Sequence, residues 1–286
     1  MASSKQDGGV ARMRALYPIA FLLVVAAPIA SAVSRSPLPP QTVAPPEDLC
    51  ADRNRHDSRR EHACEVREEA IGARTALDID PGQNGSVHVR GGGSGDVRLR
   101  TRVESYAESE SRARALVSSV RVTTTEGRIR SDGMMRMNDE HWSTSFYLDV
   151  PSKVQLSINT RNGGISLEEF SGAALMRAVN GGITLRRVGG DLKGRTQNGG
   201  LQIELAGSRW EGTGLDVETQ NGGVRLNLPA NYSAELETGT VHGRVEIDFP
   251  VVIHSGRQRV FTTTLGSGGP KVRAMTTNGS VVVRRQ

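Results

Sequence analysis

Two cysteines, Cys50 and Cys64, are the first residues in the chain whose type and spacing could do chemistry. If the chain is exported, such a pair predicts one disulfide that ties down a polar segment with little core of its own. The alternative is a metal site, because His56 and His62 lie between the two thiols. Their spacing matches no zinc finger or ribbon, and the surrounding arginines would repel a cation. The disulfide is therefore the better prediction, and no metal or other cofactor is expected.

Catalysis would require titratable groups that converge from distant segments. Four further histidines stand far apart, without sequence partners of a known catalytic type: His88, His141, His242 and His254. Asp216, Glu218 and Arg195 fall on one predicted strand face, as acidic and basic residues do in the grooves of β-helical lyases and glycosidases that act on polysaccharides. Alternating acidic and basic residues are also the ordinary pattern of a solvated strand face, and this interpretation is favoured. The chain is predicted not to be an enzyme.

The charges are too dispersed to indicate a nucleic-acid partner. The formal net charge is +5, and Lys5, Arg12 and Arg14 against Asp7 contribute +2 of it. The other basic residues, mostly Arg, alternate with Glu and Asp, whereas a nucleic-acid groove needs clustered cations with interleaved aromatic residues. With 33 Gly and only 4% aromatic residues, the composition favours short strands joined by many turns.

Residues 1–32 have the pattern of an export signal. Two arginines precede an apolar stretch over residues 15–29, and small residues then offer a cleavage site between Ala32 and Val33. The alternative is a membrane anchor, but two prolines interrupt the stretch, which is shorter than the roughly 20 residues that span a bilayer. We therefore expect no stable membrane span after cleavage, and a periplasmic or extracellular protein associated with the cell envelope.

The rest of the chain divides into four segments. We expect a Pro-rich linker over 33–48, a disulfide-tied polar segment over 49–75, a cap of strands and one helix over 76–153, and repeats over 154–286. The last two form one continuous domain from about 76 to 286.

Within the cap, alternating apolar residues predict short strands near 77–79, 87–89 and 97–99, and further strands at 121–125, 143–150 and 154–160. The helix is predicted over Tyr106–Val120, because Ser105 and Glu108 form a capping box and apolar residues follow at helical spacing. That apolar face consists of Ala113, Leu116, Val117 and Val120. On the exposed side, i, i+4 ion pairs are expected for Glu108 with Arg112 and for Glu110 with Arg114.

A tripeptide, Asn-Gly-Gly, recurs through the C-terminal half. These marks are Asn162, Gly163 and Gly164; Asn180, Gly181 and Gly182; Asn198, Gly199 and Gly200; and Asn221, Gly222 and Gly223, with variants at His242-Gly243 and Asn278-Gly279. The intervals of 18, 18 and 23 residues indicate stacked coils. Each mark is expected to be a turn at which Asn and Gly serve positions of positive φ.

The residues that flank the marks decide between antiparallel hairpins and parallel coils. Three apolar columns keep a constant offset: Ile165, Ile183, Leu201, Val224, Val245 and Val281; Leu167, Leu185, Ile203, Leu226, Ile247 and Val283; and Leu156, Ala174, Leu192, Leu215, Leu236 and Val272. Such columns are typical of parallel stacking, in which equivalent residues lie about 4.8 Å apart. The predicted fold is mainly β, a parallel β-solenoid with two strands per coil of about 18–23 residues.

Two polar columns accompany the apolar ones. Thr recurs two residues before each mark, except at Ala178, and Asn opens most of the marks. Either column could line a ligand track, but β-branched Thr stacks well in sheets and Asn amides satisfy backbone groups in turns. Both are interpreted as scaffold. Because the marks lack the Asp of calcium-binding β-rolls, no calcium is expected.

The period breaks between Asp248 and Pro270, where a hairpin over Val251–Leu265 is expected. Outward columns place opposite charges in adjacent coils, for example Lys193 and Asp216, which favours a fixed register. Val281-Val282-Val283 ends the chain with little capping after it, so edge-to-edge self-association is a further hypothesis.

Several linked features support a resemblance that extends from about Cys50 to Arg285. They are the Cys pair, the predicted helix, the Asn-Gly-Gly marks, Tyr232-Ser233-Ala234, Gly239-Thr240-Val241-His242-Gly243, Asp248-Phe249-Pro250 and Thr277-Asn278-Gly279. In these the chain resembles the bacterial putative-adhesin family of unknown function, also described as toastrack-like β-solenoid domains. The resemblance implies a β-solenoid without established catalytic residues.

These observations rank three functions. The leading one is a non-catalytic exported protein of the cell envelope, an adhesin or binding scaffold that presents a rigid solenoid surface to an unknown envelope polymer or protein. The first alternative is an envelope-stress sensor or regulatory scaffold, a role the resemblance suggests. The second, and weakest, is a polysaccharide-acting β-helix enzyme.

Overall fold

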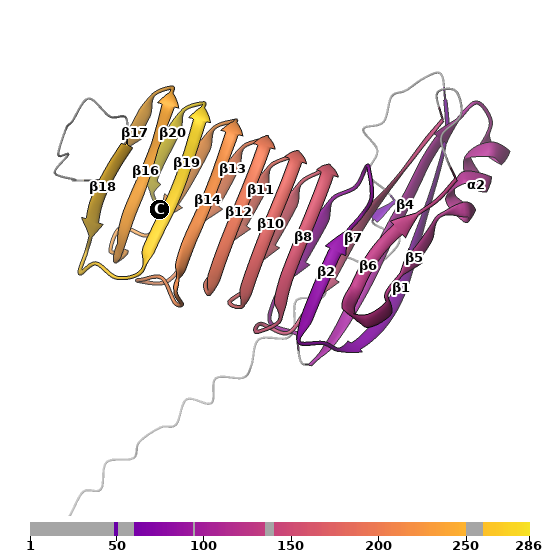
Figure 1. Ribbon diagram of the computed structural model, residues 1–286, viewed down its shortest axis with the longest axis horizontal. Coiled ribbons are helices and arrows are strands. Elements are labelled where there is room, and N and C mark those ends of the chain that lie inside the picture. Colours follow the sequence, from indigo (N-terminus) through magenta and orange to yellow (C-terminus); the bar gives the residue numbers. More distant parts are fainter. Residues whose placement is uncertain (1–48, 51–59, 94, 135–139, 250–259) are drawn as a thin grey trace, which may run out of the picture. The chain divides into compact units, whose positions relative to one another are not determined.

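The computed structural model describes residues 49–50, 60–93, 95–134, 140–249 and 260–286, and most of them belong to β-strands (Figure 1). The predicted signal, its cleavage site between Ala32 and Val33, and the Pro-rich linker lie outside the described residues. Two ten-stranded sheets enclose the main apolar core between them. Within the described part of the chain, no helix is long and apolar enough to cross a membrane.

Pairs of strands, one from each sheet, form stacked coils. In spatial order the coils are β2 (Ala76–Asp80) with β3 (Val87–Arg90), β8 (Gln155–Asn162) with β9 (Ile165–Glu168), β10 (Ala173–Asn180) with β11 (Ile183–Arg186), β12 (Asp191–Asn198) with β13 (Leu201–Glu204), β14 (Gly214–Asn221) with β15 (Val224–Leu228), β19 (Lys271–Asn278) with β20 (Val281–Arg285), and β16 (Ala234–His242) with β17 (Val245–Ile247). The sheet that contains β14 is here called the β14 sheet, and the other the β15 sheet.

The predicted parallel stacking is confirmed residue by residue. In the β15 sheet Ile183 pairs with Ile165 on one side and Leu201 on the other. In the β14 sheet Leu192 pairs in the same way with Ala174 and Leu215. These side chains point into the core and are buried. Each coil covers the apolar surface of its neighbour, which a single coil could not bury alone.

The first coil starts well before residue 154, where the repeats were expected to begin. Val87 pairs with Ile165, and Asn84 forms a bridge with Asn162, so β2 and β3 have the register of the later coils. The sequence does indicate this first coil, because residues 84–87 (Asn-Gly-Ser-Val) are identical to residues 278–281. An insertion of about 60 residues between β3 and β8 separates this coil from the rest and conceals the period.

The last coil in sequence is not the last in space. β19 lies between β14 and β16 (Figure 1). In the other sheet, β20 lies between β15 and β17. The expectation that Val281-Val282-Val283 forms an exposed edge is therefore wrong, because Val281 pairs with both Val224 and Val245. All coils have the same columns, so the columns alone do not determine their order.

The break in the period also differs from the expected hairpin. β18 (Val260–Leu265) runs antiparallel to β16, so that Leu265 pairs with Ala234. Residues 251–259 of the predicted hairpin lie outside the described residues. At the end of β13, the longer interval between marks accommodates a loop that buries Trp210, whose Nε1 donates to the Gly190 carbonyl oxygen at 3.0 Å.

An antiparallel cap precedes the regular coils. β1 (Glu61–Ala73) pairs with β4 (Asp96–Ala107), and β4 pairs with β7 (His141–Asp149), which continues the sheet in parallel to β3. On the other sheet, β6 (Arg128–Asp132) lies beside β2 and pairs on its other side with β5 (Arg121–Thr123), which precedes it in the chain and is joined to it by the short 3-10 turn η1 (Thr125–Gly127). The polar segment over 49–75 thus contains a 13-residue strand that its weak apolar pattern did not predict.

The single helix in the described residues, α2 (Glu110–Ser119), is shorter than predicted and has a different cap. The N-cap is Ser109, whose hydroxyl accepts from the Arg112 amide at 3.3 Å. Ser105 lies in β4, and its hydroxyl donates to the Ala113 carbonyl oxygen at 2.7 Å, so the predicted capping box is wrong. Pairing of β4 through Ala107 keeps that stretch extended.

The apolar face of α2 is as predicted, with Ala113, Leu116 and Val117 buried. The i, i+4 pair of Glu110 with Arg114 is present at 2.5 Å. Arg112 instead pairs with Glu140, at 2.7 Å. The helix packs against β1 and β4 and covers the end of the cap.

Candidate functional site

The Asn side chains of the marks bond mainly to one another. Each Nδ2 donates to the Oδ1 of the preceding Asn at 2.8 to 3.0 Å, in the order Asn278, Asn221, Asn198, Asn180, Asn162 and Asn84. Asn162 also donates to the Gln83 carbonyl oxygen. We expected the amides to serve the turn backbone, and only this last bond does. His242 pairs with Asn278 in register, so the amide ladder stops at the β16 coil.

The first glycine of each mark is required by the close approach of neighbouring coils. A Cβ on Gly181 would lie 2.1 Å from the Gly163 carbonyl oxygen, and one on Gly199 would lie 2.3 Å from that of Gly181. The prediction of positive φ is wrong for the marks, among which only Gly279 has a positive φ, of 156°. Stacking distance, and not turn conformation, selects glycine here.

The Thr column bonds neighbouring coils together from inside. Three hydroxyls donate to the first-glycine carbonyl of the adjacent coil at 2.6 to 2.7 Å: Thr196 to Gly181, Thr219 to Gly199 and Thr276 to Gly222. Thr160 donates instead to Gly163 of its own coil. The carbonyl that a Thr at position 178 would reach, that of Gly163, therefore already accepts one hydroxyl from its own coil. Inward Thr side chains thus belong to the scaffold and leave the outer faces as the surfaces available to a ligand.

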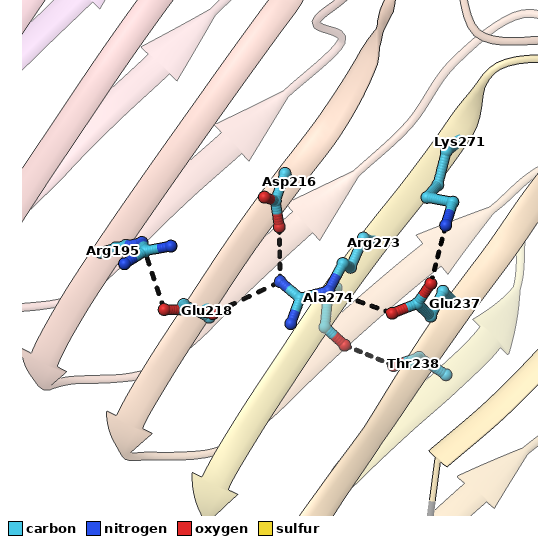
Figure 2. A network of polar contacts seen from close by, with 8 residues as sticks. All are labelled: Arg195, Asp216, Glu218, Glu237, Thr238, Lys271, Arg273 and Ala274. Atoms are coloured by element: carbon cyan, nitrogen blue, oxygen red, sulfur yellow. Dashed lines mark hydrogen bonds and ion pairs between the residues drawn. The ribbon is translucent and has the colours of Figure 1, made fainter.

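Charged side chains on the outer side of the β14 sheet form one connected group, here called the Arg273 network: Arg195, Asp216, Glu218, Glu237, Lys271 and Arg273 (Figure 2). Arg273 Nη1 lies 2.5 Å from Asp216 Oδ1 and 3.4 Å from Glu218 Oε2, while its Nε lies 3.1 Å from Glu237 Oε1. The guanidinium of β19 thereby joins the carboxylates of β14 and β16 on either side.

The hydrogen bond from Lys271, at 2.9 Å, is the main reason that the pKa of Glu237 is lowered, and Arg273 lowers it further. Of the residues suggested for polysaccharide chemistry, Asp216 and Glu218 are brought onto one face together with Arg195, which lies 3.2 Å from Glu218. Both carboxylates share Arg273, so they form ion pairs between coils. This arrangement favours the interpretation of a structural charged face over that of an acid and base pair.

On the outer side of the β15 sheet, the cap gathers histidines that are far apart in the sequence. His62 on β1, Tyr106 on β4 and His141 on β7 stand in one row, with ring centroids 4.9 and 4.8 Å apart. In the next row Glu104 contacts His62 at 3.4 Å and Arg102 at 2.9 Å. Of the four histidines predicted to lie apart, only His141 joins this row, through strand pairing that has no signal in the linear sequence.

His88 stacks on Tyr147 in the same sheet, with ring centroids 4.7 Å apart and planes inclined by 8°. Its Nε2 lies 2.9 Å from the Ser86 hydroxyl. Burial lowers the pKa of His88, and the charge of Arg102 lowers it further. His88 is thus a neutral stacking partner at the border between the cap and the first coil. In the described part of the chain, no group of three or more His, Cys, Asp or Glu side chains is placed to hold a metal ion.

The predicted disulfide is confirmed. Cys50 and Cys64 are bonded, with their Cα atoms 5.9 Å apart, so the chain that enters the domain is tied to β1. Arg102 Nη1 donates to the Leu49 carbonyl oxygen at 3.0 Å and holds the same segment against the sheet. His56, the other part of the suggested metal site, lies outside the described residues.

Comparison with protein families decides the identity of this fold. Residues 82–284 match the family described as Toastrack DUF4097. The chain belongs to this family. The match therefore includes β3 of the first coil, the inserted cap from β4 to β7 and every later coil, whereas β1 and β2 precede it. A comparison with curated proteins finds no match.

Solved structures titled as adhesins are similar to this toastrack chain at low identity. A "putative cell adhesion protein" from Clostridium sporogenes ATCC 15579 is 9% identical, covers 79% of this chain and 100% of its own, and has a TM-score of 0.39. A "putative adhesin" from Bacteroides fragilis NCTC 9343 is 12% identical, with coverages of 78% and 97% and a TM-score of 0.37. Because both TM-scores are below 0.5, the family match and the observed topology carry the assignment.

Proposed function

We propose that this toastrack protein is an exported, non-catalytic binding scaffold of the cell envelope. The observation that carries the proposal is that the side chains of each coil have different structural roles according to their position. Inward positions build the core and the Thr bonds, the Asn amides bond to each other, and only the outward strand positions remain for recognition. The disulfide supports an oxidising compartment beyond the cytoplasm.

Stacked coils suit recognition because they present side chains at a fixed spacing of about 4.8 Å across the strands. The ion pairs between coils hold these side chains in place at little conformational cost on binding. Binding of another envelope component through such a surface would make the protein an adhesin.

Binding is tested with the chain from Val33 onward, which retains every described residue. It is mixed with purified envelope fragments of the source bacterium and sedimented. Retention of the chain in the pellet, saturable by unlabelled chain, is expected. Recovery of the whole chain in the supernatant at all concentrations would contradict the proposal.

Export is tested separately by joining residues 1–48 to alkaline phosphatase, which becomes active only outside the cytoplasm. Activity is expected, and it should disappear when residues 15–29 are deleted. For catalysis, no release of saccharide fragments from the envelope is expected, with or without Asp216→Ala. Fragment release that Asp216→Ala abolishes would restore the enzyme hypothesis.

A further inference from the structure

The charge on the outer side of the β14 sheet changes along the stack of coils. The Arg273 network occupies mainly β14, β19 and β16, whereas β8, β10 and β12 present a second group, here called the cationic face: Arg161, Leu175, Arg177, Val179, Lys193 and Arg195. Among the outward positions of these three strands, the only acidic side chain is Asp191. The outer side of these three strands is therefore mainly positively charged, whereas β14, β19 and β16 carry four carboxylates there together with Lys271 and Arg273.

Two large apolar side chains of the cationic face are exposed to solvent. Leu175 is 37% exposed and Val179 is 40% exposed, on either side of Arg177 on β10. The described residues contain only three other exposed large apolar side chains, and none of them is on β8, β10 or β12. These two side chains give the surface apolar contact area next to its positive charge.

The strand register places each of these apolar side chains beside a cation. Lys193 pairs with Leu175, and Arg195 pairs with Arg177. Arg161 lies beside Val179, between the paired positions Thr160 with Ala178 and Asn162 with Asn180. Neither Arg161 nor Arg177 has an ion pair or side-chain hydrogen bond with another described residue, so both guanidinium groups are available to an anion.

We infer that the cationic face binds a bilayer surface containing anionic phospholipid. The inference rests on the proposed binding function and names its ligand class. Each cation near such a surface contributes about 1 kcal/mol, and aliphatic side chains add burial in the headgroup region. A soluble anionic polymer would engage the cations equally well but would leave Leu175 and Val179 in water, which is why the bilayer is favoured.

The test measures co-sedimentation of the chain from Val33 onward with vesicles of phosphatidylglycerol and phosphatidylcholine. Binding to mixed vesicles and not to pure phosphatidylcholine is expected, and it should fall as salt shortens the Debye length from about 10 Å at 0.1 M to about 3 Å at 1 M. The double variant Arg161→Glu/Arg177→Glu should bind at least about 25-fold more weakly, because each lost cation is worth roughly fivefold.

The matched control is Arg225→Glu/Arg284→Glu, which makes the same change in net charge on the exposed outer side of the β15 sheet. It should bind within about twofold of the unaltered chain. A third variant, Leu175→Ser/Val179→Ser, should bind several-fold more weakly without any change in charge.

Three results would overturn the inference. They are no binding to phosphatidylglycerol, an equal loss in both charge variants, and unchanged binding of the Leu175→Ser/Val179→Ser variant. Binding of soluble alginate by the cationic face, without vesicle binding, would assign the face to a polymer instead. If the chain still sediments with envelope fragments but not with vesicles, the proposed function stands and only this inference falls.

Discussion

The stacked coils and the antiparallel cap share the main apolar core, and the cap adds two small apolar clusters under α2. In the coils, contacts are repeated: the apolar columns, the Asn ladder and the Thr hydroxyl bonds recur from coil to coil, with exceptions at Ala178 and His242. In the cap, no contact is repeated, and a disulfide, a helix and stacked aromatic and histidine rings hold β1, β4 and β7 together. Repeated contacts require glycine at a set position, whereas unrepeated contacts tolerate a varied sequence.

This difference indicates which substitutions should destabilise each region. A coil should be destabilised by a side chain added where its backbone lies very close to that of a neighbouring coil. Such close backbone approaches occur on both sides of each turn. The cap should be destabilised by loss of the disulfide, because this single bond anchors β1, a strand that has few apolar residues of its own. The following predictions test whether the two regions respond independently.

The largest effect is expected for Gly181→Ala. The new Cβ would lie 2.1 Å from the Gly163 carbonyl oxygen, so the two coils must separate. We expect a loss of at least about 3 kcal/mol in the free energy of unfolding, measured by urea denaturation.

The control for Gly181→Ala is Gly223→Ser, at the second glycine of a mark. A Cβ there would lie 3.3 Å from the Ser280 carbonyl oxygen, and Ser280 itself occupies this position in the next coil. A loss under about 1 kcal/mol is expected. Equal losses in the two variants would mean that glycine acts through backbone entropy and not through coil spacing.

The next largest effect is expected for Cys50→Ser/Cys64→Ser. The disulfide closes a loop with a sequence separation of 14, and its removal should cost about 2 to 3 kcal/mol. Hydrogen exchange should accelerate at the amides of β1 and β4 and stay unchanged in β11 and β13. Equal acceleration in the coils would show that cap and coils unfold as one unit, against the comparison drawn above.

A smaller effect, about 1 to 2 kcal/mol, is expected for Thr219→Val. The shape is retained, but the Gly199 carbonyl oxygen loses its 2.7 Å bond from the buried hydroxyl. Ala178→Thr is the control, because the carbonyl it would reach already accepts from Thr160. A gain in stability from Ala178→Thr comparable to the loss from Thr219→Val would contradict this account of the Thr column.

The smallest effect concerns pH and His88. Because burial lowers the pKa of His88 in the folded protein, the unfolded chain binds a proton that the folded chain does not. The contribution of His88 to the free energy of unfolding should therefore decrease as the pH drops below about 6.5, the pKa of histidine in the unfolded chain. His88→Gln should show a shallower loss between pH 7 and pH 5 in urea denaturation. Parallel curves would show that the Tyr147 stack tolerates the charged ring.

Several features were predictable from the sequence because their physical cause is local or strictly periodic. The apolar columns determine parallel stacking, since a shift of one residue would turn every apolar side chain outward. The apolar face of α2 follows from helical spacing, and the disulfide follows from a single pair of cysteines in a chain with the pattern of an export signal. The Asn-Gly-Gly marks were correctly placed at turns, although their glycines serve stacking distance instead of positive φ.

Other features were decided only by the tertiary structure. β19 lies between β14 and β16, where Arg273 pairs with carboxylates on both sides, and identical columns alone could not reveal this order. The histidine row and the cationic face also depend on which strands are neighbours. A linear sequence determines which way a side chain points from a strand, but contacts between distant strands determine what stands beside it.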